Sequence, residues 1–311
     1  MAAVDKHQSV PFRARDYLHP RYWGMWLVIG LLRLAALLPY RAQLRLGAWL
    51  GRRMQQLSKK RRRVVDINLK LCFPDKSPQE RDAIRDRCFE NLGISLMEMA
   101  ICWWWPDKKI RPLIEVRGLE HIETCQQQGR GVILLSGHFT SLEIGGRLLV
   151  QYIDMQAMYR TQRNRLFDSL LYSKRKGYLA DIISRKNTLK LLKGIRRGIP
   201  TWYAPDQDFR HERNVFAPFF GVPTATITAS SRLAKSARAA MLPYFPERKA
   251  DGSGYILHIL PPLEDFPSGD DLADATAINA SIEQFVRQHP DQYMWVHQRF
   301  KTRPPGEAPI Y

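Results

Sequence analysis

The chain has 311 residues, of which 45% are hydrophobic, with 48 Lys and Arg against 30 Asp and Glu and a formal charge of +18. This length and hydrophobic content suffice for a sizeable buried core and exclude a generally disordered chain, while the charge favours a polyanionic partner: a nucleic acid, an anionic membrane, an acidic protein or a phosphorylated substrate. The four cysteines show no Cys-x-x-Cys spacing and no neighbouring histidine, so they give no zinc-site pattern, and a reducing compartment is the simpler interpretation.

The most apolar segment is Trp23–Pro39, which only Arg33 interrupts. It is slightly short for a transmembrane helix, which needs about 20 apolar residues. Positive charges on both flanks give no clear orientation, and the late start without a small-residue cleavage site disfavours a signal peptide. We therefore expect residues 1–58 to form a membrane anchor with a basic flank, shallow or in the membrane plane, and residues 59–311 to form a single α/β domain.

A basic cluster, Lys59–Arg63, begins the predicted domain. Near an anionic leaflet each such charge contributes about 1 kcal/mol to binding. The same cluster is equally compatible with a solvated helix face.

Residues Ser77–Trp105 show helical spacing, with apolar side chains three or four positions apart and Ser77-Pro78 as the start. The helix ends in three adjacent tryptophans, Trp103–Trp105. These predict an interfacial belt or the wall of an acyl-chain groove, or, for one or two of them, ordinary core packing.

After Gly131 short apolar segments alternate with amphipathic ones, which predicts an α/β fold with a mixed sheet flanked by helices. The expected strands are Val132–Leu135, Met155–Tyr159, Thr201–Ala204, Met241–Phe245 and Tyr255–Leu260. The expected helices are Leu142–Tyr152, Leu166–Lys176, Thr188–Arg197, Ile227–Ala237 and Ile278–Gln288. No glycine-rich phosphate-binding loop is present, so nucleotide chemistry has no support.

His138 and Glu143 stand where the first of these strands gives way to a helix. Ligands of open α/β sheets bind at the carboxyl ends of strands, so an imidazole at this point is placed to take a proton from an alcohol. Residues Thr140–Glu143 also match a capping box in which Thr140 is the N-cap and Glu143 only bonds back to it. Taken alone, a histidine in such a position is more often structural than catalytic.

Further charged residues follow the other predicted strands. Arg160 ends the second strand, Asp206 and Asp208 follow the third, and Arg175 lies on the helix between them. Arginine can bind phosphate bidentately, and an opposing carboxylate can orient a sugar or a second base. Their convergence at one sheet edge predicts a site there.

Several segments together resemble a known family. Gly137–Glu143 is similar to the His-x4-Asp/Glu motif of glycerolipid-type acyltransferases. The further segments that narrow the match to the late acyltransferases of lipid A biosynthesis, the lauroyltransferase group, are Met158–Arg160, Trp202–Asp208, Pro218–Gly221 and Gln292–Pro304. The resemblance extends from about Tyr22 to Pro304.

The resemblance implies a glycerolipid-acyltransferase-like fold with an N-terminal hydrophobic membrane-anchoring helix, on the cytoplasmic face of the inner membrane. It implies transfer of a fatty acyl group, lauroyl in the first instance, from acyl carrier protein to a hydroxyacyl chain of the lipid A precursor Kdo2-lipid IVA, without cofactor or metal. His138 would be the general base and Glu143 its partner, with Arg175 and Asp206 also in the catalytic site. Arg160, Arg185 and Asp208 are the residues expected to bind substrate. Anionic inner-membrane lipids are the third expected partner, and no nucleic acid is expected.

Three other functions compete with this one. The chain could add the second secondary acyl chain to a penta-acylated lipid A precursor. A serine hydrolase would use Ser136, but the segment lacks a Gly-x-Ser-x-Gly elbow and places Ser136 inside the strand. A non-catalytic basic protein binding membranes or nucleic acid fits the charge but not the tryptophan-rich apolar segments.

Overall fold

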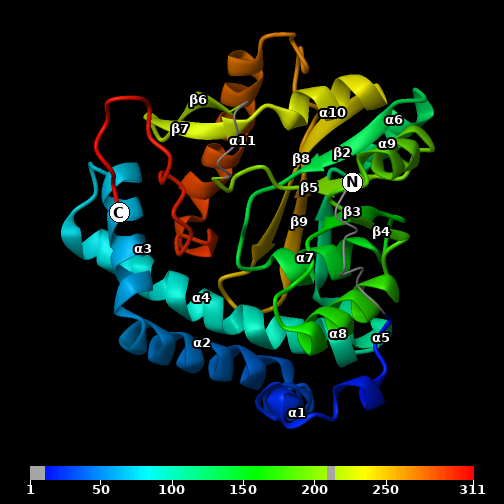
Figure 1. The fold of residues 1–311 in the computed structure, drawn as a ribbon, viewed down its shortest axis with the longest axis vertical. Helices are drawn as coiled ribbons and strands as arrows, with labels where there is room; N and C mark the ends of the chain where they lie inside the picture. The colour runs from blue at the N-terminus through cyan, green and yellow to red at the C-terminus, as the bar shows by residue number, and fades with distance from the viewer. Residues whose placement is uncertain (1–10, 209–213) are drawn as a thin grey trace, which may run out of the picture.

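The computed structural model describes residues 11–208 and 214–311 and is built around a seven-stranded sheet with strand order β1-β9-β8-β2-β5-β3-β4 (Figure 1). Neighbouring strands are parallel except β8 and β9, which are antiparallel, so β1 and β9 run against the other five and the predicted mixed sheet is confirmed. The strands of this sheet are β1 (Ile114–Arg117), β2 (Gly131–Leu135), β3 (Gln156–Tyr159), β4 (Asp181–Ser184), β5 (Thr201–Tyr203), β8 (Ala239–Arg248) and β9 (Tyr255–Ile259). A separate antiparallel ribbon consists of β6 (Asn214–Phe219) and β7 (Val222–Ile227).

Helices cover both faces of the sheet. The α-helices are α1 (Trp23–Ala35), α2 (Tyr40–Leu57), α3 (Lys59–Cys72), α4 (Pro78–Trp104), α5 (Asp107–Ile110), α6 (Leu119–Gln127), α7 (Leu142–Leu149), α8 (Arg165–Lys176), α9 (Thr188–Arg196), α10 (Ala229–Ala237) and α11 (Asp271–Gln288). The short 3-10 helices are η1 (Ala14–Tyr17), η2 (Pro20–Tyr22), η3 (Arg111–Leu113) and η4 (Pro290–Gln292). One buried cluster joins the sheet to α3, α9, α10, α11 and the start of α4, and the other joins it to α1, α6, α7, α8 and the end of α4.

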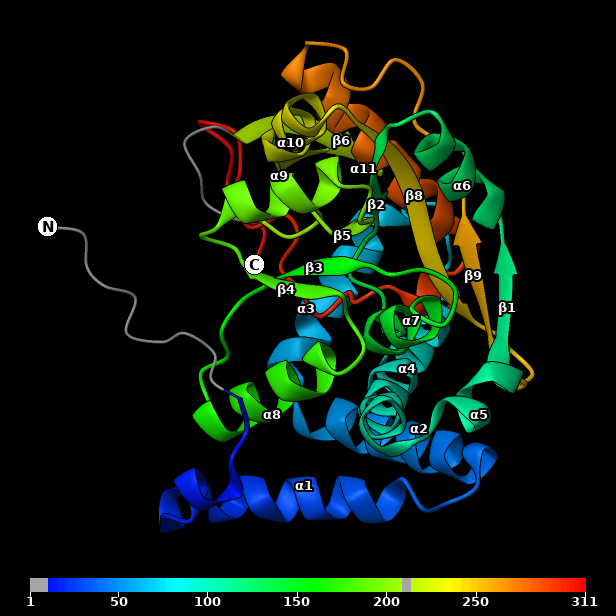
Figure 2. The ribbon, with the colours of Figure 1, turned by 90° about the vertical axis from the view of Figure 1, so that its right-hand side faces the viewer.

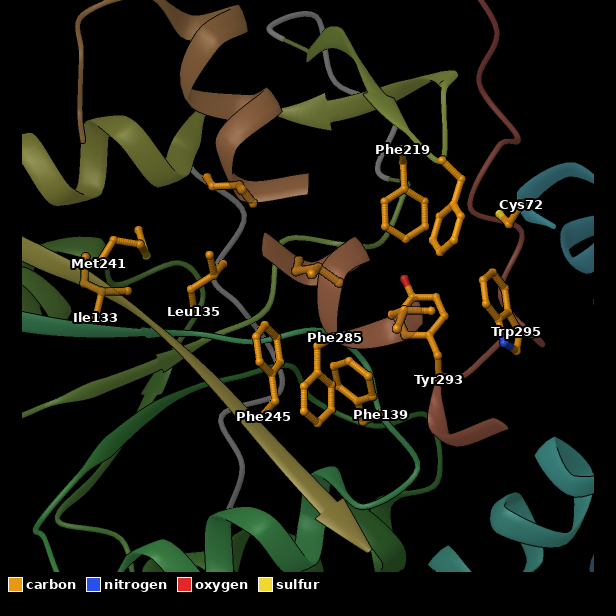
Figure 3. Close-up of a cluster of buried hydrophobic side chains, with 14 of the residues drawn as sticks. Cys72, Ile133, Leu135, Phe139, Phe219, Met241, Phe245, Phe285, Tyr293 and Trp295 are labelled. Carbon is orange, nitrogen blue, oxygen red and sulfur yellow. The ribbon is translucent and has the colours of Figure 1, made fainter. Parts of the chain in front are cut away.

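Strand β2 shows why both faces must be covered. Ile133 and Leu135 belong to one cluster, Val132 and Leu134 to the other, and all four side chains are fully buried. Alternating side chains of a strand point to opposite faces, so a continuous apolar run needs two cores. Figure 3 shows the first cluster, where aromatic side chains gather beside the end of the strand. This packing fixes the chain where it leaves β2.

Most predicted elements are confirmed, with boundaries shifted by up to three residues, except that α11 begins at Asp271, seven residues before the predicted start. The prediction missed β1, β4, β6 and β7, and it assigned Ile227 to a helix although this residue ends β7. Strands β1 and β4 are only four residues long and mix charged with apolar residues. Strands β6 and β7 each contain a proline, Pro218 and Pro223, which a two-stranded ribbon tolerates because its outer edges need no ladder partner.

The N-terminal helices lie outside the sheet layers. In Figure 2, α1 runs along the outer edge of the molecule and α2 lies between it and α4. Helices α2 and α4 cross closely, because a Cβ built on Gly51 or Gly93 would overlap backbone atoms of the other helix. Among the described residues no helix combines the length and the apolarity needed to cross a membrane.

The helix predicted at Ser77–Trp105 is confirmed as α4, and Ser77 is its N-cap in a complete capping box with Glu80. Of the terminal tryptophans, Trp103 is buried in the second cluster, while Trp104 and Trp105 are half-buried. Trp105 Nε1 donates to Ala36 O at 2.7 Å, which ties α4 to the end of α1. Core packing of Trp103 is therefore the interpretation that holds.

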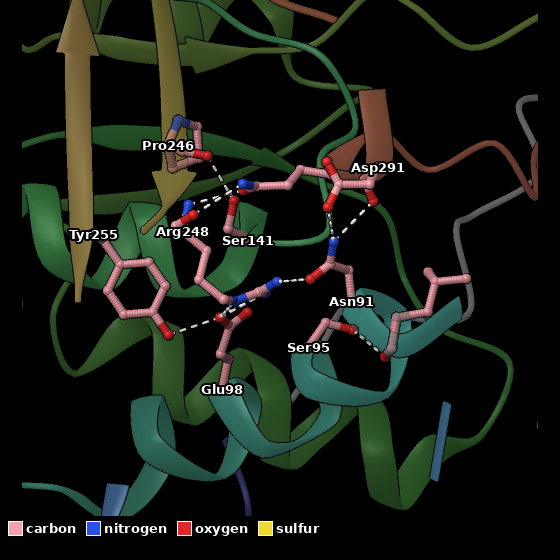
Figure 4. A network of polar contacts seen from close by, with 10 residues as sticks. Asn91, Ser95, Glu98, Ser141, Pro246, Arg248, Tyr255 and Asp291 are labelled. Atoms are coloured by element: carbon pink, nitrogen blue, oxygen red, sulfur yellow. Dashed lines mark hydrogen bonds and ion pairs between the residues drawn. The ribbon is translucent and has the colours of Figure 1, made fainter. Parts of the chain in front are cut away.

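A buried polar network joins α4 to β8 and β9 (Figure 4). Arg248 Nε donates to Glu98 Oε1 at 2.7 Å, and Tyr255 OH donates to the same oxygen at 2.7 Å. Arg248 Nη1 also donates to Asn91 Oδ1 at 2.5 Å, and Asn91 Nδ2 donates to the backbone of Asp291 at 2.9 Å. Through Asp291 the network supports η4, which leads into the segment that contacts the candidate site.

Candidate active site

His138 lies in the loop between β2 and α7, at the carboxyl end of the strand, as the sequence predicts. The loop is fixed by a neighbouring segment, because Met294 N donates to His138 O at 2.9 Å and Thr140 N donates to Gln292 O at 2.8 Å. Gly137 permits this close packing, since a Cβ there would lie 3.0 Å from the Phe139 ring and 3.1 Å from Ile282. The His138 backbone is thus held on both sides.

The carboxylate beside the His138 ring belongs to Asp206, which follows β5. Asp206 Oδ1 lies 2.5 Å from His138 Nδ1, while Asp206 Oδ2 accepts from His138 N at 2.7 Å and from Tyr293 OH at 2.8 Å. The Asp206 side chain is 2% exposed and the His138 side chain 23%. The geometry leaves His138 Nε2 as the ring nitrogen without a carboxylate contact.

The electrostatics of the pair favour a charged imidazolium. Burial alone would lower the pKa of His138, but the Asp206 carboxylate outweighs burial and holds that pKa above its ordinary value. Burial would raise the pKa of Asp206, yet His138 and its hydrogen bonds hold that pKa well below its usual range. Asp206 is therefore an anion throughout the physiological range.

Glu143 is expected from the sequence analysis to be the partner of His138, but the two side chains are not in contact. Arg175 Nε donates to Glu143 Oε1 at 3.1 Å, Arg175 Nη2 forms an ion pair with Oε2, and Tyr178 OH donates to Oε1 at 3.1 Å. The reason is helical direction: α7 begins at Leu142, so the Glu143 side chain lies on the first turn and points toward α8. Burial would raise the pKa of Glu143, but Arg175 holds it below its ordinary value.

The predicted capping box at α7 is also absent. The N-cap is Ser141, and no side chain caps the helix. Ser141 Oγ instead donates to Pro246 O at 2.6 Å, and the Glu143 carboxylate is used by Arg175 and Tyr178. The Glu143 carboxylate thus contacts neither the His138 ring nor the Thr140 backbone, and instead joins α7 to α8.

Two aromatic rings flank His138 that the sequence analysis did not single out. The ring centroids of Trp202 and His297 lie 6.4 Å and 5.7 Å from that of His138. Burial, and then the charge of His138, lower the pKa of His297 to about 4, so this imidazole is neutral at physiological pH. His297 Nε2 lies 3.4 Å from Gln207 Nε2, and Asn68 Nδ2 donates to His297 O at 2.9 Å. Tyr293 and His297 both fall in the segment Gln292–Pro304, so the resemblance already marked the region that supplies them.

The residues expected to bind substrate do not form one group. Arg160 and Arg185 are exposed just after the carboxyl ends of β3 and β4. Asp208 accepts from Thr302 N at 2.6 Å and from Thr302 Oγ1 at 2.9 Å, so its carboxylate fixes the C-terminal segment. Arg160 and Arg185 remain accessible to a ligand at the edge of the sheet where His138 lies.

Two alternative chemistries find no matching geometry. Ser136 is buried, and its Oγ lies 3.4 Å from Gly137 O, so it does not face the imidazole as a serine nucleophile does. Within residues 11–208 and 214–311, no three His, Cys, Asp or Glu side chains gather as metal ligands would. The arrangement that remains is an imidazole with one nitrogen on a buried carboxylate, which suits general base catalysis.

Comparisons with known proteins agree with this chemistry. A family model described as bacterial lipid A biosynthesis acyltransferase matches residues 11–302. The chain is 41% identical to the lipid A biosynthesis lauroyltransferase of Escherichia coli (strain K12), over 97% of this chain and 99% of that protein. It is 38% identical to the palmitoleoyltransferase of the same strain, over 96% and 97% of the two chains, and 34% identical to its myristoyltransferase, over 98% and 95%.

Proposed function

The chain belongs to the bacterial lipid A biosynthesis acyltransferase family, and from this premise we propose that it transfers a lauroyl group from acyl carrier protein to a hydroxyacyl chain of Kdo2-lipid IVA. The observation that carries the proposal is the pair of His138 and Asp206, 2.5 Å apart at the carboxyl end of β2, in which Nε2 is left for substrate.

His138 Nε2 takes the proton of the acceptor hydroxyl as its oxygen attacks the thioester carbonyl. The new C–O bond forms, the tetrahedral oxyanion collapses, and the C–S bond breaks. The imidazolium then returns the proton to the departing thiolate, so the products are an ester and a thiol. General base catalysis of this kind typically supplies about 10²–10⁴-fold in rate.

Asp206 is the partner of the base in this mechanism. Its contact with Nδ1 keeps a proton on that nitrogen, so the free electron pair lies on Nε2, and its charge stabilises the imidazolium that forms. Glu143 and Arg175 support the site indirectly, because their ion pair holds the first turn of α7 against the last turn of α8. They are positioning residues rather than catalytic ones.

The choice of lauroyl rests on the degree of similarity, which is 41% to a lauroyltransferase against 38% and 34% to relatives named for other chains. The alternative is addition of the second secondary chain to a penta-acylated precursor, which the similarity to the myristoyltransferase supports. Both reactions use the same imidazole chemistry, so the acceptor decides between them.

The enzyme acts at the cytoplasmic face of the inner membrane, which it contacts through α1 and its neighbours. The apolar side chains exposed there, which we call the α1–α2 surface, include Trp23, Leu27, Leu31, Leu34, Leu37, Trp49 and Leu57, and Leu57 is 85% exposed. These side chains gather on neighbouring helices, whereas single scattered apolar residues are normal on a protein surface. An apolar helix next to basic residues is suited to lying in the plane of a membrane that contains anionic lipids. The basic residues Lys59–Arg63 continue directly from it at the start of α3.

A test of the proposal offers both acceptors to the purified protein. Lauroyl, myristoyl and palmitoleoyl thioesters of acyl carrier protein are supplied in turn with Kdo2-lipid IVA or its penta-acylated product, and the products are identified by mass. Preferred lauroyl transfer to Kdo2-lipid IVA supports the proposal, and transfer only to the penta-acylated acceptor supports the alternative. Absence of an added acyl group in every combination contradicts both.

A further inference from the structure

A small cavity lies between α7 and α8 over the second face of the sheet. Its volume is about 50 Å³, and apolar side chains make most of its wall. Leu142 and Gly146 line it from α7, Ala157 and Trp202 from β3 and β5, and Met155 and Leu179 close the end near the start of β3. Met155 and Leu179 are buried in the core cluster, so packed side chains bound the cavity toward the start of β3.

The cavity adjoins the candidate catalytic pair. Trp202 forms part of its wall and also lies beside His138, with 6.4 Å between ring centroids. Glu143, Arg175 and Tyr178 bring polar atoms to the wall, but these bond to one another, so the charges need no ligand to balance them. An apolar chain can therefore pass them without leaving an unpaired charge.

Gly146 is the position that controls the space. A Cβ built on Gly146 would meet no atom within 4 Å, whereas one built on the preceding Gly145 would lie 2.6 Å from Pro246. A larger side chain at position 146 therefore extends into free space beside the cavity and leaves the packing of α7 on β8 intact.

We propose that this cavity receives the methyl end of the donor acyl chain, and that Gly146 sets the length of the chain which the enzyme transfers. The inference rests on the proposed acyltransferase function and adds the determinant of chain length. A cavity of this size holds about three water-sized groups, far less than a whole ligand, so it accommodates only the last carbons of the chain. The remaining carbons lie along Trp202 toward the thioester at His138.

The closed end makes the site selective. Met155 and Leu179 are buried, with exposed fractions of 2% and 8%, and belong to the core cluster behind the cavity. A chain too long by one methylene meets this wall, and one methylene in an apolar pocket changes the rate about tenfold or more. Leu179→Ala removes part of the wall, so it shifts the preference in the opposite direction from a substitution that fills the cavity.

The test compares Gly146→Met with a control, Ala280→Met. Both positions are helical, but Ala280 is exposed on α11, which packs on the opposite face of the sheet from the cavity. Initial rates are measured on a single acceptor. The donors are thioesters of acyl carrier protein whose acyl chains have roughly 8 to 16 carbons, in steps of two carbons. Circular dichroism and thermal unfolding establish that each variant is folded.

We expect Gly146→Met to lower transfer of the longest chain that the wild type accepts by about tenfold or more and to leave chains two to four carbons shorter within about twofold. Leu179→Ala should extend the range to longer chains, and Ala280→Met should match the wild type. An equal loss at every length, or an unchanged length profile, in a folded Gly146→Met would overturn the inference. Absence of transfer by the wild type at every length would instead overturn the proposed function.

Discussion

Asp206→Asn removes a charge from the candidate site without changing the shape of the side chain. Oδ2 of Asp206 accepts two hydrogen bonds, from His138 N and Tyr293 OH, whereas Oδ1 faces only His138 Nδ1. An asparagine therefore keeps its oxygen at the position of Oδ2 and turns its amide N–H toward Nδ1. That N–H forces Nδ1 to be an acceptor and moves the ring proton to Nε2, where it blocks the base.

The expected loss in kcat is about 10²–10⁴-fold, the range for a positioned general base. The stability should fall by only about 1–3 kcal/mol, because the hydrogen bonds to the backbone and to Tyr293 persist. The assay is the initial rate of acyl transfer read by mass, with unfolding followed in urea. Asp274→Asn is the matched control, since Asp274 is 2% exposed and accepts two bonds from Ser268 far from His138. Transfer by folded Asp206→Asn within threefold of the wild type would refute the reasoning.

Glu143→Gln should lower the free energy of unfolding by up to about 3–5 kcal/mol, because Arg175 then lacks its counter-charge in a mostly buried site, and urea unfolding that matches the wild type would contradict this. Gly51→Ala should cost about 1–3 kcal/mol, because its Cβ overlaps the α4 backbone, and an undiminished melting temperature would show that the crossing of α2 and α4 is looser than described. Because the pKa of His138 is raised and the base must be neutral, transfer should rise with pH through an apparent pKa above 6.5, and an apparent pKa below that value would argue against Asp206 as the partner. The double variant Leu27→Ser, Leu31→Ser should reduce flotation with anionic vesicles, and undiminished flotation would place the membrane contact elsewhere.

The sequence predicts the sheet well where strands are apolar on both faces. The predicted bounds of β2, which is buried throughout, agree with the structure within one residue, and those of α8 and α9 agree equally well, whereas α11 begins seven residues before its predicted start. Strands β1 and β4 are absent from the prediction. They are short and carry Glu115 and Asp181, so their apolar and polar residues show no distinct alternation. Such residues join a sheet only if a distant segment pairs with them in the right register. The local sequence pattern carries no information about that pairing.

The position of His138 at the end of β2 agrees with the prediction, but the expected contact between His138 and Glu143 is not found. His138 at the end of β2 followed from local sequence, and the expected convergence at this sheet edge holds for Asp206. The family resemblance implied that Glu143 is the partner of His138, whereas the carboxylate that contacts the ring lies 68 residues after His138 in the sequence, beyond β5. That contact depends on β2 and β5 being neighbours in the sheet, which the sequence alone did not fix.

The central claim is that His138 is the base of an acyl transfer onto a lipid A precursor. Its most direct test incubates lauroyl acyl carrier protein and Kdo2-lipid IVA with the wild type and with folded His138→Ala, side by side, and records the mass of the lipid. The account predicts a gain of one lauroyl group with the wild type and a loss of about 10²–10⁴-fold or more in the rate with the variant. Equal rates for the two proteins would contradict the assignment of the base, and no gain with the folded wild type would contradict the proposed donor and acceptor.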